Sequence, residues 1–179
     1  MKIPENKTLQ ELFEWRFSRT PDSVAHKFLD RETTYKELNN YSNQVANGLI
    51  DLGCKPDTRI AYYGKNSDFF FEVLIGTLKS NTVTVGVNWR LAPPEVSYVL
   101  NDSESEVLFV GADFYPVIDQ ILEDLPKIKK VVAIDGDHEN YQDYISWRNS
   151  HKSANAEIKS SPNDDILQLY TSGTTGHPK

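Results

Sequence analysis

Short apolar segments that alternate with helical segments constrain the fold of this chain more than any other feature of its sequence. The segment Lys130–Ile134, for example, places Val131, Val132 and Ala133 side by side, so it is apolar on both faces. Strands of a parallel sheet have this pattern because helices cover both faces of such a sheet. The alternation therefore predicts a layered α/β fold, with a mostly parallel sheet and helices on both faces.

The expected elements follow from local patterns along the chain. Residues 23–35 predict a hairpin of two short strands. A helix follows, because Thr34 and Glu37 form a capping-box pattern and apolar residues then recur at helical spacing until Gly53. Further strands are expected at residues 59–63, 82–87, 106–110, 130–134 and 165–170. Further helices are expected at residues 68–79, 93–100, 114–125 and 141–148.

The composition is that of a folded protein, since 39% of the residues are apolar and 11% are aromatic. Acidic residues outnumber basic ones by 26 to 19 and no basic cluster occurs, which argues against nucleic acid as a partner. No apolar run reaches the ~20 residues that a membrane span requires, and residues 1–10 are polar. We therefore expect a cytoplasmic protein without a membrane span, and the sequence indicates no oligomeric state.

Cysteine and histidine suggest no separate catalytic centre. Cys54 is the single cysteine and follows Gly53 at the expected end of a helix, so a structural role is expected for its thiol. His26, His138 and His151 are isolated in the sequence, and we expect them to pack against neighbours or to lie at the surface.

Two connections between elements also have recognisable composition. Residues 151–163 are rich in Ser, Asn and Lys, which predicts a surface linker that leads into the last strand. Asn88, Trp89 and Arg90 follow an expected strand, and they are interpreted as a turn in which Arg90 pairs with Glu95.

The segment of residues 170–179 has a composition suited to polyphosphate. Gly173 and Gly176 let backbone N–H groups approach phosphate oxygens closely, and Lys179 supplies a compact positive charge. Four hydroxyl groups can donate to the same oxygens; they belong to Thr171, Ser172, Thr174 and Thr175. The P-loop of nucleotide triphosphatases would require a lysine after the second glycine, where His177 stands. A flexible surface turn is the alternative interpretation of such a composition.

The order of residues 170–179 resembles the phosphate-loop signature of the adenylate-forming superfamily, which includes acyl-CoA synthetases, luciferases and peptide-synthetase adenylation domains. All nine fixed positions of Tyr-Thr-Ser-Gly-Thr-Thr-Gly-x-Pro-Lys are present. Similar segments occur upstream in the order found in that family, at residues 34–38, 64–67 and 87–95. Residues 88–103 look most like fatty-acyl-CoA synthetases and related enzymes. The chain departs from the commoner family pattern at Asn81-Thr82, where Gly-Ala is frequent, and at Gly86, where Pro is frequent.

The resemblance implies that residues 1–179 are the N-terminal portion of the large AMP-binding domain, without its later part and without the C-terminal domain. It implies an acid-thiol ligase that joins a fatty or related carboxylic acid to AMP and then to CoA, with ATP and Mg²⁺ as cofactors. By the same resemblance, Ser172–Gly176 bind phosphate, Thr171 lies near the metal and Lys179 is catalytic. We expect the fragment alone to be inactive. The alternative is a truncated, non-catalytic binding or interaction module derived from that family.

Overall fold

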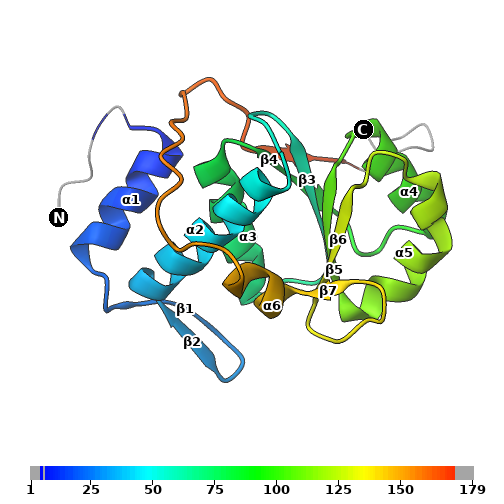
Figure 1. The fold of residues 1–179 in the computed structure, drawn as a ribbon, viewed down its shortest axis with the longest axis horizontal. Coiled ribbons are helices and arrows are strands. Elements are labelled where there is room, and N and C mark those ends of the chain that lie inside the picture. The colour runs from blue at the N-terminus through cyan, green and yellow to red at the C-terminus, as the bar shows by residue number, and fades with distance from the viewer. Residues whose placement is uncertain (1–4, 6, 172–179) are drawn as a thin grey trace. The chain divides into compact units, whose positions relative to one another are not determined.

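The computed structural model describes residues 5 and 7–171, which fall into two compact units (Figure 1). Unit 1 comprises Met1–Pro56, Ser67–Thr82 and Arg148–Ile166. Unit 2 comprises Asp57–Asn66, Val83–Trp147 and Leu167–Lys179. Helices and a two-stranded hairpin form unit 1, whereas unit 2 is built around a six-stranded sheet.

The hairpin and the helix that follows it in unit 1 confirm the prediction from sequence. Strands β1 (Val24–Phe28) and β2 (Arg31–Thr34) pair in antiparallel orientation. Helix α2 (Tyr35–Asp51) begins at Thr34, whose hydroxyl accepts a hydrogen bond from the Glu37 N–H at 3.2 Å. The Glu37 carboxylate accepts from the Thr34 N–H at 2.8 Å, which completes the capping box.

Helix α1 (Leu9–Arg19) was not expected from the sequence. It begins with a second capping box, in which the Thr8 hydroxyl accepts from the Glu11 N–H and the Glu11 carboxylate accepts from the Thr8 N–H. Its residue Phe17 is buried with Leu38 and Ile75 in the core of unit 1. The helix therefore contributes to the core of this unit.

Helix α3 (Asp68–Ser80) packs closely against α2 in unit 1. A Cβ atom at Gly76 would lie 2.4 Å from Cγ1 of Val45, so only glycine fits this contact without movement. The helix ends at Asn81, which adopts the left-handed conformation with φ of 53°. Because asparagine tolerates this conformation, the departure from the commoner glycine at residue 81 is compatible with the fold.

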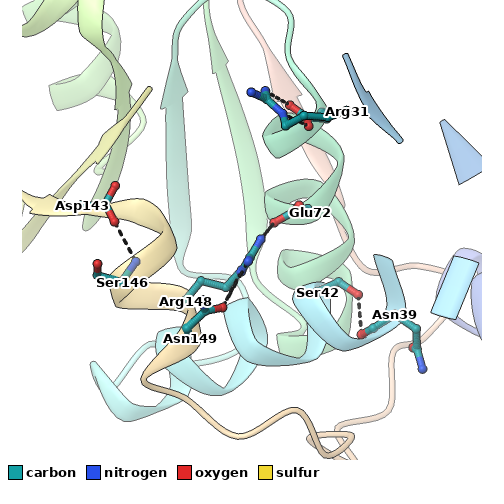
Figure 2. A network of polar contacts seen from close by, with 9 residues as sticks. Arg31, Asn39, Ser42, Glu72, Asp143, Ser146, Arg148 and Asn149 are labelled. Atoms are coloured by element: carbon teal, nitrogen blue, oxygen red, sulfur yellow. Dashed lines mark hydrogen bonds and ion pairs between the residues drawn. The ribbon is translucent and has the colours of Figure 1, made fainter. Parts of the chain in front are cut away.

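A buried ion pair also lies in unit 1, and Figure 2 shows it. The Arg148 guanidinium donates to the Glu72 carboxylate at 2.7 Å, and both side chains are almost fully buried. Arg148 also donates to the Asn149 side chain and lies 3.8 Å from the centroid of the Tyr41 ring. These contacts hold the beginning of the connection to the last strand.

The connection of residues 151–163 contains no helix or strand, in agreement with the predicted linker. It is nevertheless held by amide side chains of α2. Asn43 donates to the Ser153 carbonyl at 2.8 Å, and Asn47 donates to the carbonyls of Lys152 and Ala154 at 2.8 Å each. The backbone of this segment thus finds hydrogen-bond partners on the helix.

Unit 2 confirms the α/β prediction. All neighbouring strands are parallel, and their order across the sheet is β7-β6-β5-β3-β4-β8. The strands are β3 (Arg59–Tyr63), β4 (Val83–Val87), β5 (Val107–Gly111), β6 (Lys130–Ile134), β7 (Gln142–Asp143) and β8 (Leu167–Leu169). The central strand β5 is buried from Val107 to Val110, as its apolar sequence predicted.

Helices of unit 2 lie on both faces of this sheet. On one face, α4 (Pro93–Asp102) and α5 (Tyr115–Ile121) share a core with the β5 side chains of Leu108 and Val110 (Figure 1). Between these two side chains, Phe109 points to the opposite face and contacts Tyr144 and Trp147 of α6 (Tyr144–Asn149). Short 3-10 turns flank α5 at Ala112–Phe114 and Leu122–Asp124.

Three expected elements of unit 2 differ from the prediction at their boundaries. The helix expected at residues 114–125 is limited to Tyr115–Ile121, because a 3-10 turn follows at Leu122–Asp124. The helix expected at residues 141–148 is wrong at its start, because Gln142 and Asp143 pair with β6 as strand β7 before α6 begins. The strand expected at residues 165–170 is limited to Leu167–Leu169, the part that pairs with β4. Within the described part of the chain, no helix has the length and apolar character needed to cross a membrane.

Candidate functional site

The candidate site lies where the sheet of unit 2 ends at its carboxyl edge. The strands are parallel, so the segments that follow β3, β4 and β8 leave the sheet at the same edge. Thr171, one of the residues predicted to bind phosphate, is exposed there, two residues beyond β8. Ser172, Gly173, Thr174, Thr175, Gly176 and Lys179 lie outside the described residues, so their assignment to phosphate stays a prediction.

Cationic and aromatic side chains follow the neighbouring strands at this edge. Lys65, after β3, pairs with Asp113, after β5, at 2.7 Å. Two cations lie over the ring of Trp89, which follows β4: the Arg90 guanidinium is 4.1 Å and the Lys65 ammonium 5.9 Å from its ring centroid. Cations over an indole ring interact favourably with its face. The edge thus carries positive charge on the strands nearest to β8.

The predicted turn after β4 is present, but one of its contacts differs from the expectation. The Asn88 side chain accepts from the Arg90 N–H at 3.0 Å, as in a turn stabilised by asparagine. The predicted pairing of Arg90 with Glu95 is wrong, since the Arg90 guanidinium lies over Trp89. The Glu95 carboxylate instead accepts from the Ala92 N–H at 2.8 Å, where it satisfies a backbone donor at the start of α4.

Tyr170 connects the end of β8 to Thr171, and its hydroxyl has two partners. The hydroxyl donates to the Asp102 carboxylate at 2.6 Å and accepts from the Gln168 side-chain amide at 2.9 Å. Burial raises the pKa of the Tyr170 hydroxyl, and the bond to Asp102 and the charge of that carboxylate raise it further. The hydroxyl therefore stays protonated and remains a donor at neutral pH.

The contact between Tyr170 and Asp102 could not be predicted from the sequence. The two residues are 68 positions apart, and neither short-range spacing nor composition connects them. The only available signal was that both belong to segments that resemble the same superfamily.

The cysteine and the isolated histidines have packing contacts. Cys54, the single cysteine of the sequence, is buried. The His138 ring stacks on Tyr141 at 3.9 Å, and the His151 ring lies 3.0 Å from the Asp51 carboxylate. Burial lowers the pKa of His26, whose ring stacks against Phe71. Such contacts are those of packing residues, as predicted.

Comparison with known proteins shows a match between this chain and a protein family. The sequence profile described as "AMP-binding enzyme" matches residues 13–179. A fatty acid–[acyl-carrier-protein] ligase, ScoC of Streptomyces coeruleorubidus, is 36% identical over 98% of this chain, which covers 33% of that protein. The long-chain-fatty-acid–CoA ligase FadD13 of Mycobacterium tuberculosis is 36% identical over 84% of this chain, which covers 29% of that protein.

A solved structure agrees with these relatives. The anthranilate CoA ligase AuaEII in complex with anthranoyl-AMP superposes with a TM-score of 0.91 and 30% identity. The superposition covers 99% of this chain and 35% of that structure. The chain therefore spans about a third of the length of the curated relatives and of this structure.

Proposed function

Because the chain belongs to the AMP-binding enzyme family, we propose that it is the N-terminal portion of an ATP-dependent acyl-CoA synthetase. In this proposal, residues 1–179 are the first part of the large AMP-binding domain. The later part of that domain and a C-terminal domain complete the enzyme. The support is that related ligases match nearly the whole chain but extend well beyond its length.

One observation carries the proposal. The ten-residue segment that begins at Tyr170 leaves the carboxyl end of β8, the neighbour of β4 in a parallel sheet. In open α/β sheets, ligands bind outside the carboxyl ends of the strands. A segment rich in glycine, hydroxyl groups and lysine at this edge has the composition that a polyphosphate ligand requires.

The proposed reaction has two steps. A carboxylate oxygen of the acid attacks the α-phosphorus of ATP, the bond to the β-phosphate breaks, and pyrophosphate leaves. The CoA sulfur then attacks the acyl carbon and AMP leaves. Negative charge develops on pyrophosphate in the first step, so we assign the N–H and hydroxyl donors of Ser172–Gly176 and the Lys179 ammonium to its stabilisation. Lys179 is the proposed catalytic residue.

Thr171 is the residue that we assign to Mg²⁺, which would neutralise phosphate charge when bound. Its exposed position beyond the end of β8 fits this role. In the described part of the chain, no group of three or more His, Cys, Asp or Glu side chains is arranged to hold a metal. A single protein ligand such as Thr171 nevertheless fits a magnesium site, because Mg²⁺ in phosphate-transfer sites takes most of its ligands from water and substrate phosphates.

The proposed acid is a fatty or related hydrophobic carboxylic acid, and the proposed acyl acceptor is CoA. The two relatives, a fatty acid–[acyl-carrier-protein] ligase and a long-chain-fatty-acid–CoA ligase, are both named for a fatty acid, which supports this class of acid. A cytoplasmic location is part of the proposal.

A panel of acids tests this function in the natural full-length protein that contains the chain. Acid-dependent AMP release and acyl-CoA formation would be measured with fatty acids of several lengths, aromatic acids and amino acids. We expect AMP and acyl-CoA from fatty acids, and no aminoacyl adenylate. The isolated 179-residue chain is the control, and it should release no AMP.

Two results would contradict the proposal. Preference for an amino acid would assign the protein to the peptide-synthetase branch of the family. Failure of every acid in a folded protein that binds ATP would favour the non-catalytic module.

A further inference from the structure

The hydroxyl of Tyr170 is held in a relay of hydrogen bonds whose direction is fixed. The Arg59 guanidinium, on β3, donates to the Gln168 side-chain oxygen at 2.8 Å. This contact orients the Gln168 amide so that its NH₂ group donates to the Tyr170 hydroxyl at 2.9 Å. The hydroxyl in turn donates to the Asp102 carboxylate at 2.6 Å. Each donor in the relay has a defined acceptor.

The far end of the relay is anchored in the core of unit 2. Asp102 is the last residue of α4, and this helix is fixed by Val96, Val99 and Leu100, which are almost completely buried. The Tyr170 ring also packs against the same core cluster. Both the ring and the hydroxyl of Tyr170 are therefore held by well-packed parts of the unit.

Strand β8 is a short support for the segment that follows it. It has three residues, each paired with a residue of β4. Among the described residues, the contacts of Tyr170 add a connection from the end of this strand to α4 and to the core of unit 2.

We propose that Tyr170 is a positioning residue for residues 171–179, the phosphate-binding segment. Asp102 and Gln168 fix the Tyr170 hydroxyl. The inference rests on the proposed function. It gives a role to Tyr170, the first residue of the motif, and adds Gln168 and Asp102, which lie outside the motif. Tyr170 acts through its neighbour Thr171 and does not touch substrate. By holding the start of the segment, it raises the fraction of molecules in which the donors are arranged for ATP.

A second pair of the same chemistry supplies a matched control within unit 2. The Tyr141 hydroxyl donates to the Asp119 carboxylate, and burial followed by this bond raises its pKa, as for Tyr170. Tyr141 precedes β7, at the opposite edge of the sheet from β8. Removal of either hydroxyl deletes one bond to a carboxylate, but only Tyr170 adjoins the phosphate-binding segment.

The test compares Tyr170→Phe with Tyr141→Phe in the natural full-length protein. The readouts are the KM for ATP and the kcat in acid-dependent pyrophosphate exchange, and the thermal midpoint. If the fraction of molecules that are arranged to bind ATP falls tenfold, the KM for ATP rises about tenfold, whereas kcat at saturating ATP changes little. We expect this result for Tyr170→Phe, an unchanged KM for Tyr141→Phe, and similar decreases in thermal midpoint.

Variants of Asp102 sharpen the test. Asp102→Asn keeps an oxygen that accepts the bond, so its KM for ATP should stay within about threefold of the wild type, because a neutral bond is weaker but not lost. Asp102→Ala should resemble Tyr170→Phe. The double variant Tyr170→Phe/Asp102→Ala should be no worse than either single variant, because both delete the same bond. Equal KM values for all these variants and the wild type would overturn the proposal.

Amide hydrogen exchange separates this inference from the proposed function. Tyr170→Phe should speed exchange at residues 167–171 and not at 141–144, and Tyr141→Phe should do the reverse. If the wild type shows no acid-dependent pyrophosphate exchange, the proposed function fails. In that case, faster exchange at residues 167–171 in Tyr170→Phe still supports a positioning role, and unchanged exchange there overturns it.

Discussion

The two units bury different kinds of polar group. Of the described residues, four charged side chains are buried, and all of them belong to unit 1: Asp68, Glu72, Lys79 and Arg148. Apart from tyrosines, the buried polar side chains described in unit 2 are three hydroxyls, those of Thr84, Ser103 and Ser105. A buried charge is tolerated only with suitable partners, whereas a hydroxyl is easily satisfied. Unit 1 therefore depends on electrostatic contacts, and unit 2 on apolar packing of its sheet.

This difference bears on the candidate site, which belongs to unit 2. Its described polar residues, such as Lys65 and Tyr170, lie at strand ends and outside the buried part of the sheet. Changes to these side chains should therefore alter function without unfolding the unit. Changes to the buried charges of unit 1 should instead act mainly on stability.

The largest effect is expected for Arg148→Met in unit 1. This change leaves the Glu72 carboxylate buried without its guanidinium partner, so the free energy of unfolding should fall by about 3–5 kcal/mol. Chemical denaturation monitored by fluorescence measures the loss. The double variant Glu72→Leu/Arg148→Met should recover much of it, because two apolar side chains then replace the pair.

The matched control is Lys129→Met in unit 2, which breaks an exposed pair. The Lys129 ammonium lies 2.7 Å from the Glu106 carboxylate, and its side chain is 59% exposed. An exposed pair of this kind contributes about 0–1 kcal/mol. Equal losses in Arg148→Met and Lys129→Met would contradict the proposed difference between the units.

Lys79 in unit 1 should make the free energy of unfolding depend on pH, with an effect of intermediate size. Burial lowers the pKa of its ammonium to about 8, although the charge of Glu14 acts in the opposite direction. The ammonium donates to the side-chain oxygens of Asn39 and Asn43 and lies 5.3 Å from the Phe17 ring centroid. Between pH 8 and 10.5 the unfolded chain binds more protons than the folded one, so stability rises with pH.

The comparison of wild type with Lys79→Met measures this effect. The free energy of unfolding of the wild type should gain about 2 kcal/mol relative to Lys79→Met between pH 8 and pH 10. Parallel pH profiles for the wild type and Lys79→Met would show that Lys79 has an ordinary pKa.

A smaller effect than that of Lys79 is expected for Tyr141→Phe in unit 2. The change removes one hydrogen bond to the Asp119 carboxylate, whose side chain is 47% exposed. Because solvent can replace this bond, the free energy of unfolding should fall by only about 1 kcal/mol. A loss as large as that of Arg148→Met, measured by the same denaturation, would mean that unit 2 also depends on a buried polar network.

Local patterns were sufficient to predict most elements of the fold. Thr34 and Glu37 identified the start of α2, because both partners of a capping box lie within four residues. The same signal, with Thr8 and Glu11, was present before α1 and was overlooked in a segment that is polar at its beginning. The strand β7 has two residues, too few for any periodicity, and only its pairing with β6 defines it.

Contacts between distant residues could not be predicted in this way. The bond from Asn43 to the Ser153 carbonyl depends on how the chain returns after 110 residues. The phosphate-binding segment was found from its composition and order, and a strand directly before it was predicted, but its pairing with β4 was not. The bond from Tyr170 to Asp102 joins segments that only the folded sheet brings together.

Acid-dependent pyrophosphate exchange in Lys179→Ala, made in the natural full-length protein, is the most direct test of the central claim that residues 171–179 bind the phosphates of ATP. Loss of a charge that faces the leaving pyrophosphate should slow exchange by about 100-fold or more. The thermal midpoint should stay that of the wild type, and Lys130→Ala, which removes a partly exposed lysine of β6, should exchange normally. Wild-type exchange in Lys179→Ala would contradict the claim.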